Sequence, residues 1–128
     1  MNLLLDSHSL LWSFASPDAL SPLARRAILS SSNRIYVSAA SIWELSIKSA
    51  SGKVDAKSLF AADLKRLLST RGFLRLAISC DHALRARQLP LVHKDPFDRM
   101  LAAQAQALNF PIISADTIFD RYAVQRIW

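Results

Sequence analysis

The residues of this chain best suited to chemistry are four carboxylic acids, Asp6, Glu44, Asp98 and Asp116. Asp6 directly follows a short apolar segment, residues 3–5, and Asp116 comes shortly after another apolar segment. Glu44 and Asp98 each lie early in a segment whose apolar residues have helical spacing. Carboxylates that are brought together repel one another, and a divalent cation relieves that repulsion. Because every donor atom is an oxygen, the set favours Mg²⁺ or Mn²⁺, and no Cys/His spacing indicates zinc.

Each acid also has a simpler structural interpretation. Asp6 is suited to a turn that ends a strand, and Asp116 is suited to capping a short helix. Ser41-x-x-Glu44 matches a capping box, in which the glutamate binds only the start of its own helix. Asp98 would be favoured near a helix start by the helix dipole alone. The metal-site hypothesis therefore depends on the shared placement of the acids rather than on any one of them.

Side-chain patterning adds one argument for Glu44. It shares a helical face with Ala40, Trp43 and Ile47, and a lone glutamate on an apolar face needs a partner. The three tryptophans are expected to be core or interface residues rather than base-stacking platforms, and Cys80 a small buried hydrophobe.

The elements that must position these acids alternate between strands and helices. Short apolar or β-branched segments predict strands over residues 3–5, 35–37, 74–78, 111–114 and 124–128. Helical spacing, caps and breakers predict helices over residues 10–14, 22–29, 39–50, 59–68, 79–89 and 96–108. This alternation predicts a single α/β domain, residues 1–128, with parallel strands and helices on both faces of one sheet. In such sheets sites form beyond the carboxyl ends of the strands, where all four acids are expected.

Net charge indicates an anionic partner. Sixteen Lys and Arg against ten acids give a formal charge of +6, which favours nucleic acid. Without the four site acids, six acids remain and the rest of the chain carries 16 − 6 = +10. Candidates for attracting phosphates are Arg25, Arg26, Arg34, Arg66, Arg71, Arg75, Arg85 and Arg87.

Several classes of protein are excluded or disfavoured. With only Gly52 and Gly72, the chain has no glycine-rich phosphate loop. His8, His82 and His93 are scattered without a nucleophile-like serine or cysteine, which disfavours a hydrolase triad. A single cysteine, no signal-peptide pattern and only short apolar runs predict a cytoplasmic protein without a membrane segment.

Four segments of the chain form one recognisable set of motifs. They are residues 3–12 (LLLDSHSLLW), 38–48 (SAASIWELSIK), 93–105 (HKDPFDRMLAAQA) and 112–116 (IISAD). Together they resemble the motifs of PIN-domain nucleases, in the right order and over nearly the whole chain, and the third segment is the most specific. The similarity is greatest to the VapC-type toxins of bacterial toxin–antitoxin pairs. Ser7 and Ser114 stand where relatives often carry threonine, so the hydroxyl is retained.

The resemblance implies a three-layer α/β/α domain that cleaves RNA with Mg²⁺ or Mn²⁺. It maps the catalytic and metal-binding acids onto Asp6, Glu44, Asp98 and Asp116, with Asp98 rather than Asp95 as the third acid. It further implies a homodimer held inactive by a cognate antitoxin. The sequence-based expectation is therefore a metal-dependent endoribonuclease that acts as the toxin of such a pair.

Two other classes of protein remain as alternatives. A phosphoacceptor receiver domain also uses aspartates at strand ends, but it needs paired acids after its first strand and a late lysine, which this chain lacks. A non-catalytic nucleic-acid-binding module that retains the PIN fold should tolerate loss of a site acid, yet all four acids are present. The metal-dependent ribonuclease is the preferred interpretation.

Overall fold

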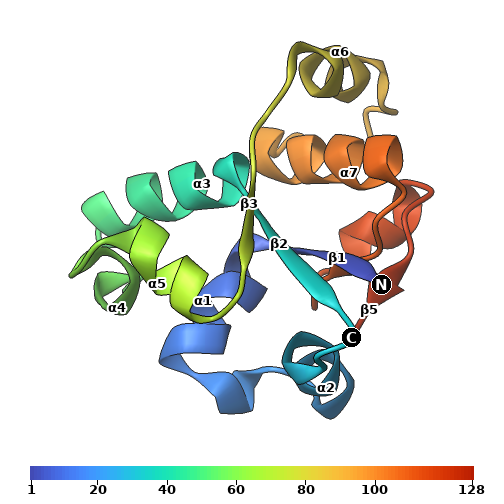
Figure 1. Cartoon of the computed structure of the whole chain (residues 1–128). Helices are drawn as coiled ribbons and strands as arrows, with labels where there is room; N and C mark the ends of the chain where they lie inside the picture. The colour runs from blue at the N-terminus through green and yellow to red at the C-terminus, as the bar shows by residue number, and fades with distance from the viewer.

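A computed structural model describes all 128 residues, and a parallel sheet forms its centre (Figure 1). The strands are β1 (Asn2–Leu5), β2 (Arg34–Ser38), β3 (Leu74–Leu76), β4 (Ile112–Ile113) and β5 (Arg126–Ile127). Their order in the sheet is β3-β2-β1-β4-β5, and every neighbouring pair is parallel. The predicted α/β class with a mainly parallel sheet is thus confirmed.

Seven α-helices and two short 3₁₀ helices connect the strands. The α-helices are α1 (Ser7–Ala15), α2 (Pro22–Leu29), α3 (Ala39–Ala50), α4 (Lys57–Phe60), α5 (Leu64–Thr70), α6 (Cys80–Gln88) and α7 (Pro96–Leu108). The 3₁₀ helices are η1 (Pro17–Ala19) and η2 (Thr117–Arg121). None of the helices combines the length and apolar composition needed to cross a membrane.

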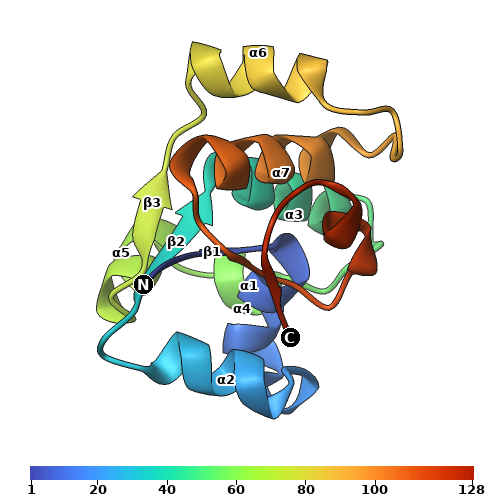
Figure 2. The ribbon, with the colours of Figure 1, turned by 90° about the vertical axis from the view of Figure 1, so that its right-hand side faces the viewer.

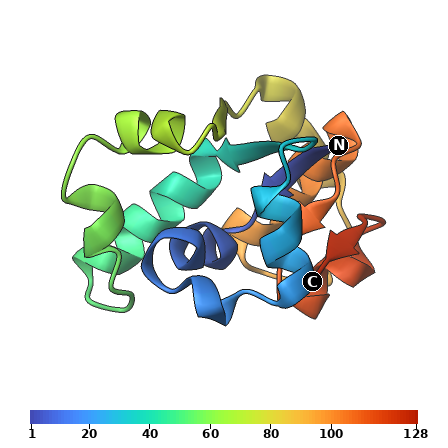
Figure 3. The same ribbon diagram turned by 60° about the horizontal axis from the view of Figure 1, so that its bottom comes forward.

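Alternating side chains of the central strands build a core on each face of the sheet. Leu3 and Leu5 of β1 point to one core, and Leu4 points to the other. The first core includes residues of α1, α2 and α5, and the second includes residues of α7. Figure 2 shows α6 and α7 on one side of the sheet and α1 and α2 on the other. Turning the molecule brings α1 and α2 in front of the sheet (Figure 3). Burial on both faces explains why these strands are almost purely apolar.

Local capping chemistry sets the helix that carries Asp98. The side chain of Asp95 accepts hydrogen bonds from the backbone N–H of Phe97 at 2.8 Å and of Asp98 at 3.2 Å. Pro96 occupies the first helical position, where its missing N–H is not needed. Asn109 ends α7 in the left-handed conformation, with φ of 54°. These signals explain why α7 spans the residues predicted for it.

Two predictions from side-chain patterning were wrong. Residues 59–68 form no single helix, because Asp63 accepts hydrogen bonds from the N–H groups of Lys65 and Arg66 and so begins a second helix, α5. Cys80 is exposed at the start of α6 rather than buried. Trp43 is 62% exposed and lies outside the core, so of the two roles expected for it only an interface role remains.

Candidate metal centre

Two of the predicted acids meet where β1 and β4 end. These strands are parallel neighbours, with Leu5 opposite Ile113, so Asp6 and Ser114 follow them at the same edge of the sheet. The Ser114 hydroxyl donates a hydrogen bond to Oδ2 of Asp6 and accepts one from the backbone N–H of Asp116 at 3.0 Å. One serine therefore connects Asp6 with the loop that carries Asp116.

Asp6 is a buried carboxylate, only 5% exposed. Its Oδ1 accepts a hydrogen bond of 2.7 Å from the backbone N–H of Ser9, which caps α1. Burial raises the pKa of Asp6, and the hydrogen bonds from Ser114 and Ser9 oppose that rise. Asp6 therefore does cap α1, but a capping residue does not need to be buried. A buried carboxylate at a strand end gains from a nearby cation.

Glu44 lies inside α3 and makes no capping box. The helix is capped by Ser38, whose hydroxyl accepts from the N–H of Ala40 at 3.0 Å. Glu44 is 3% exposed, and its two oxygens accept hydrogen bonds from the Ser7 hydroxyl and the Lys48 ammonium. Because Ser7 directly follows Asp6, this contact holds the Glu44 carboxylate close to the end of β1.

The apolar face predicted around Glu44 is only partly present. Ala40 is buried with Glu44, whereas Trp43 and Ile47 are 62% and 45% exposed. The partner that the buried glutamate needs is supplied by α1 and by its own helix, and not by apolar neighbours alone.

Asp98 occupies the first turn of α7 with an unusual ionisation. Burial raises the pKa of its carboxyl to about 6, and the negative charges of Asp95 and Glu44 add to the rise. The ring Nε2 of His93 lies 2.9 Å from Oδ2 of Asp98, and this hydrogen bond opposes the rise in the pKa of Asp98. The charge of Glu44 thus contributes to the raised pKa of Asp98, and the helices that carry these two residues, α3 and α7, pack against each other.

The tightest group of potential ligands is His93, Asp95 and Asp98. One ligand atom from each lies within 4.8 Å of the others. Asp6, Glu44 and Asp116 are outside this group. Ser114 and Ser7 connect these three acids to the end of β1, and of the three only the charge of Glu44 contributes to the raised pKa of Asp98. The sequence alone indicates no more than a loop or supporting role for His93 and a cap for Asp95. The spacing His-x-Asp-x-x-Asp across a helix start is the signal that could have drawn attention to them.

Asp116 is the most exposed of the four acids. Its Oδ1 accepts a hydrogen bond of 2.9 Å from the N–H of Ile118, so it also caps η2. Nearby, Asp120 pairs with Arg126 through contacts of 2.9 and 3.1 Å, as a salt-bridge partner rather than a site residue. The guanidinium of Arg126 lowers the pKa of Asp120.

The chemistry of these side chains fits a hard divalent cation. The donors are carboxylate oxygens, and burial together with mutual repulsion raises the pKa of Asp98, while burial raises that of Asp6. Both effects indicate a deficit of positive charge that a divalent cation would offset.

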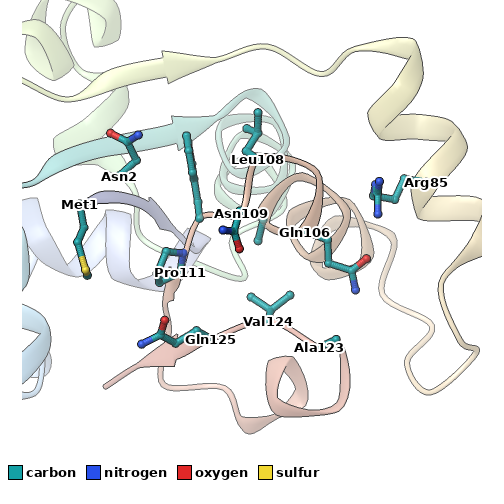
Figure 4. Close-up of a pocket in the computed structure, with 12 residues that line it drawn as sticks. Met1, Asn2, Arg85, Gln106, Leu108, Asn109, Pro111, Ala123, Val124 and Gln125 are labelled. Carbon is teal, nitrogen blue, oxygen red and sulfur yellow. The ribbon is translucent and has the colours of Figure 1, made fainter.

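A hollow of about 630 Å³ lies at the opposite edge of the sheet (Figure 4). It is lined by residues that precede β1, β4 and β5, including Met1, Pro111 and Gln125, and by Arg85 and Gln106. None of the residues lining it is an acid. The hollow therefore offers no carboxylate to a metal ion, and the acids lie instead at the carboxyl ends of the strands.

Comparisons with known proteins agree with this architecture. The family model "PIN domain" matches residues 3–125. Among solved structures, VapBC2 from Rickettsia felis bound to a DNA fragment from the promoter superposes with a TM-score of 0.73 at 16% identity, covering 98% of this chain and 97% of that one. The DNA-bound VapBC from Salmonella typhimurium superposes with a TM-score of 0.67 at 17% identity, covering 98% of this chain and 96% of that one.

VapBC-1 from nontypeable Haemophilus influenzae gives a TM-score of 0.65 at 21% identity, again covering 98% of this chain and 96% of that one. The comparison with curated proteins finds no significant match in sequence. At these identities the structures show a shared fold. The family model covers nearly the whole chain, and the chain therefore belongs to the PIN domain family.

Proposed function

We propose that this protein is a Mg²⁺- or Mn²⁺-dependent endoribonuclease and the toxin of a toxin–antitoxin pair. The observation that carries the proposal is the buried Asp6 carboxylate at the end of β1, joined through Ser114 to the Asp116 loop and through Ser7 to Glu44. Asp98 adds a carboxylate whose pKa is raised to about 6. Carboxyl groups whose pKa values are raised by burial and by like charges are typical of functional sites.

The residues of the chain would divide the work of phosphodiester hydrolysis. When bound, a divalent cation supplies positive charge that offsets the charge developing on the phosphate. Asp6 and Asp98 would hold it, with Glu44 and Asp116 completing the set. Ser7 and Ser114 fix the orientation of two of these carboxylates by hydrogen bonding. One of the four carboxylates would accept the proton of the attacking water.

Surface charge supports an anionic substrate, although two of the eight candidate arginines have structural partners. Arg71 donates to the carbonyl oxygen of Ser13 at 3.2 Å and lies over the ring of Phe14 at 4.4 Å. Arg25 pairs with Asp18 at 3.4 Å. The other six form no ion pair and remain available for phosphates. They are Arg26, Arg34, Arg66, Arg75, Arg85 and Arg87.

The partner part of the proposal follows from the structural neighbours. They include a toxin–antitoxin complex from Klebsiella pneumoniae and the VapBC structures above. We propose that this chain binds a cognate antitoxin, which covers the acidic site. We propose further that it forms a homodimer and is located in the cytoplasm.

Mapping of 5′ ends after incubation with total RNA tests the activity. Purified protein is supplied with Mg²⁺, Mn²⁺ or chelator, and compared with Asp98→Asn and with Asp81→Asn, an exposed aspartate in the first turn of α6. We expect discrete metal-dependent cuts from the wild type and from Asp81→Asn, and none from Asp98→Asn. RNA binding without cuts, from folded protein free of antitoxin, would instead support a non-catalytic binding module.

A further inference from the structure

Lys48 places an ammonium group inside the candidate metal centre. It lies one helical turn after Glu44 and donates a hydrogen bond to Oε2 of that carboxylate, while Ser7 occupies Oε1. The Glu44 side chain is 4% exposed and the Lys48 side chain 30% exposed. A pair with this spacing on an exposed helix surface contributes little to stability. This pair is different, because Glu44 is buried and would otherwise face other carboxylates.

The ammonium is also affected by the negative charges of Asp95 and Asp98 at the start of α7. The hydrogen bond with Glu44 raises the pKa of Lys48, and the charges of Glu44, Asp95 and Asp98 raise it further. Lys48 thus carries positive charge where the carboxylates of α3 and α7 repel one another. A divalent cation at the same place would meet two obstacles, an occupied Oε2 and a positive charge a few ångströms away.

We infer that Lys48 is the internal counter-ion of the metal centre, which holds Glu44 in the metal-free protein and competes with the divalent cation for it. The inference rests on the proposed function, since it requires the acids to bind a metal. Lys48 is here a positioning residue. Its expected effects are to stabilise the metal-free fold and to weaken metal binding.

Metal binding without RNA tests this inference. Mn²⁺ titrations, followed by the electron paramagnetic resonance signal of the free ion, compare wild type with Lys48→Met, which keeps the aliphatic chain and loses the ammonium. Lys53→Met removes the same charge from an exposed residue that has no ion pair. Lys48→Arg keeps the charge, and Lys48→Gln keeps a donor for Glu44 should Lys48→Met fail to fold.

We expect Lys48→Met and Lys48→Gln to bind Mn²⁺ about tenfold more tightly than wild type, as removal of a nearby unit charge predicts. Lys53→Met should change the affinity by less than about twofold, because screening weakens exposed charges. In chelator the melting temperature of the Lys48→Gln variant should fall, and saturating Mn²⁺ should raise it by more than in wild type.

Two results would overturn the inference, and they are distinguishable. If wild type binds Mn²⁺ and both neutral variants bind it equally or more weakly, Lys48 is not a competitor, and the metal site itself stands. If neither wild type nor any variant binds Mn²⁺, the metal centre of the proposed function fails as well. Tighter binding by Lys48→Arg would also contradict a role of its charge.

Discussion

Ser114 shows how much one side chain contributes to the acidic site. Its hydroxyl is buried, donates to Asp6 and accepts from the N–H of Asp116. In Ser114→Ala the buried Asp6 carboxylate loses a donor, and we expect the free energy of unfolding to fall by about 1–3 kcal/mol. Urea denaturation measures the loss. Ser46→Ala, which removes an exposed hydroxyl bonded to its own helix, should change stability little. Equal losses in both variants would contradict a special role for Ser114.

The protonation of Asp98 predicts an unusual dependence of stability on pH. Its pKa is about 6 in the folded protein and about 3.9 in an unfolded chain. Between these values the folded state binds more protons than the unfolded state, so the free energy of unfolding decreases as pH rises. The metal-free protein should therefore lose stability from about pH 4 to about pH 6, and Asp98→Asn should lose less. Thermal melts across this range test it, and parallel curves for the two proteins would refute it.

Above pH 6 the ionised Asp98 carboxylate should lower the stability of the metal-free protein. Ionised Asp98 is disfavoured by burial and by Asp95 and Glu44, so the metal-free Asp98→Asn variant should melt at a higher temperature than wild type at pH 8. Addition of Mg²⁺ or Mn²⁺ should reverse the order, since only the wild type keeps the carboxylate. Differential scanning calorimetry with and without metal measures both orders. A variant that melts below the metal-free wild type would show that Asp98 is needed for folding.

At the scale of elements, sequence was informative where local chemistry decides the structure. Residues 96–108 were predicted as a helix and α7 has those bounds, because Asp95, Pro96 and Asn109 act on their own neighbourhood. The prediction of one helix over residues 59–68 was wrong because the apolar spacing continues across Asp63, where one helix has ended and α5 begins. The strands could be predicted because residues 3–5, 35–37 and 112–113 of β1, β2 and β4 are short apolar or aromatic segments.

The site was harder to predict, because its contacts join distant segments. Ser7 reaches Glu44 across 37 positions, and Ser114 reaches Asp6 across 108. A sequence shows that Glu44 has a lysine at i+4, but not that the pair is buried. Nor does it show that Trp43, one residue earlier, faces out. Strand-end placement identified the candidate acids, and only tertiary packing gives their neighbours.

Gln104 connects α7 with the rest of the fold and supplies a prediction for that element. It is fully buried, accepts from the Ser38 hydroxyl, and contacts the carbonyl of Ala77 and the ring of His82, both at 3.2 Å. Gln104→Leu removes the acceptor of the buried Ser38 O–H and the donor to the carbonyl of Ala77, so we expect about 2–4 kcal/mol less stability. Chemical denaturation compares it with Gln106→Leu, which is half-buried and forms no side-chain hydrogen bond. A loss below about 1 kcal/mol would show that the network contributes little.

The charge of the whole molecule bears on how RNA reaches an acidic centre. A net charge of +6 with four acids gathered at one edge leaves the rest of the surface strongly basic. Phosphates are then attracted over a long range and repelled only close to the carboxylates. Binding of single-stranded RNA by the Asp98→Asn variant, which we expect not to cleave it, should weaken about tenfold or more between 50 and 200 mM salt, as about three phosphate contacts predict. Fluorescence anisotropy of a labelled oligonucleotide gives the slope.

We expect one lysine, Lys94, to contribute more to RNA binding than other exposed lysines do. Lys94 is exposed and lies in the chain between His93 and Asp95, two members of the group of potential ligands. In the Asp98→Asn background, Lys94→Gln should reduce the salt slope by about one and weaken binding, because one phosphate contact is lost. Lys65→Gln, an equally exposed lysine on α5, removes the same charge away from the metal centre and should leave the slope nearly unchanged. Equal effects of the two changes would mean that RNA responds only to net charge, and that it does not approach the metal centre past the loop before α7.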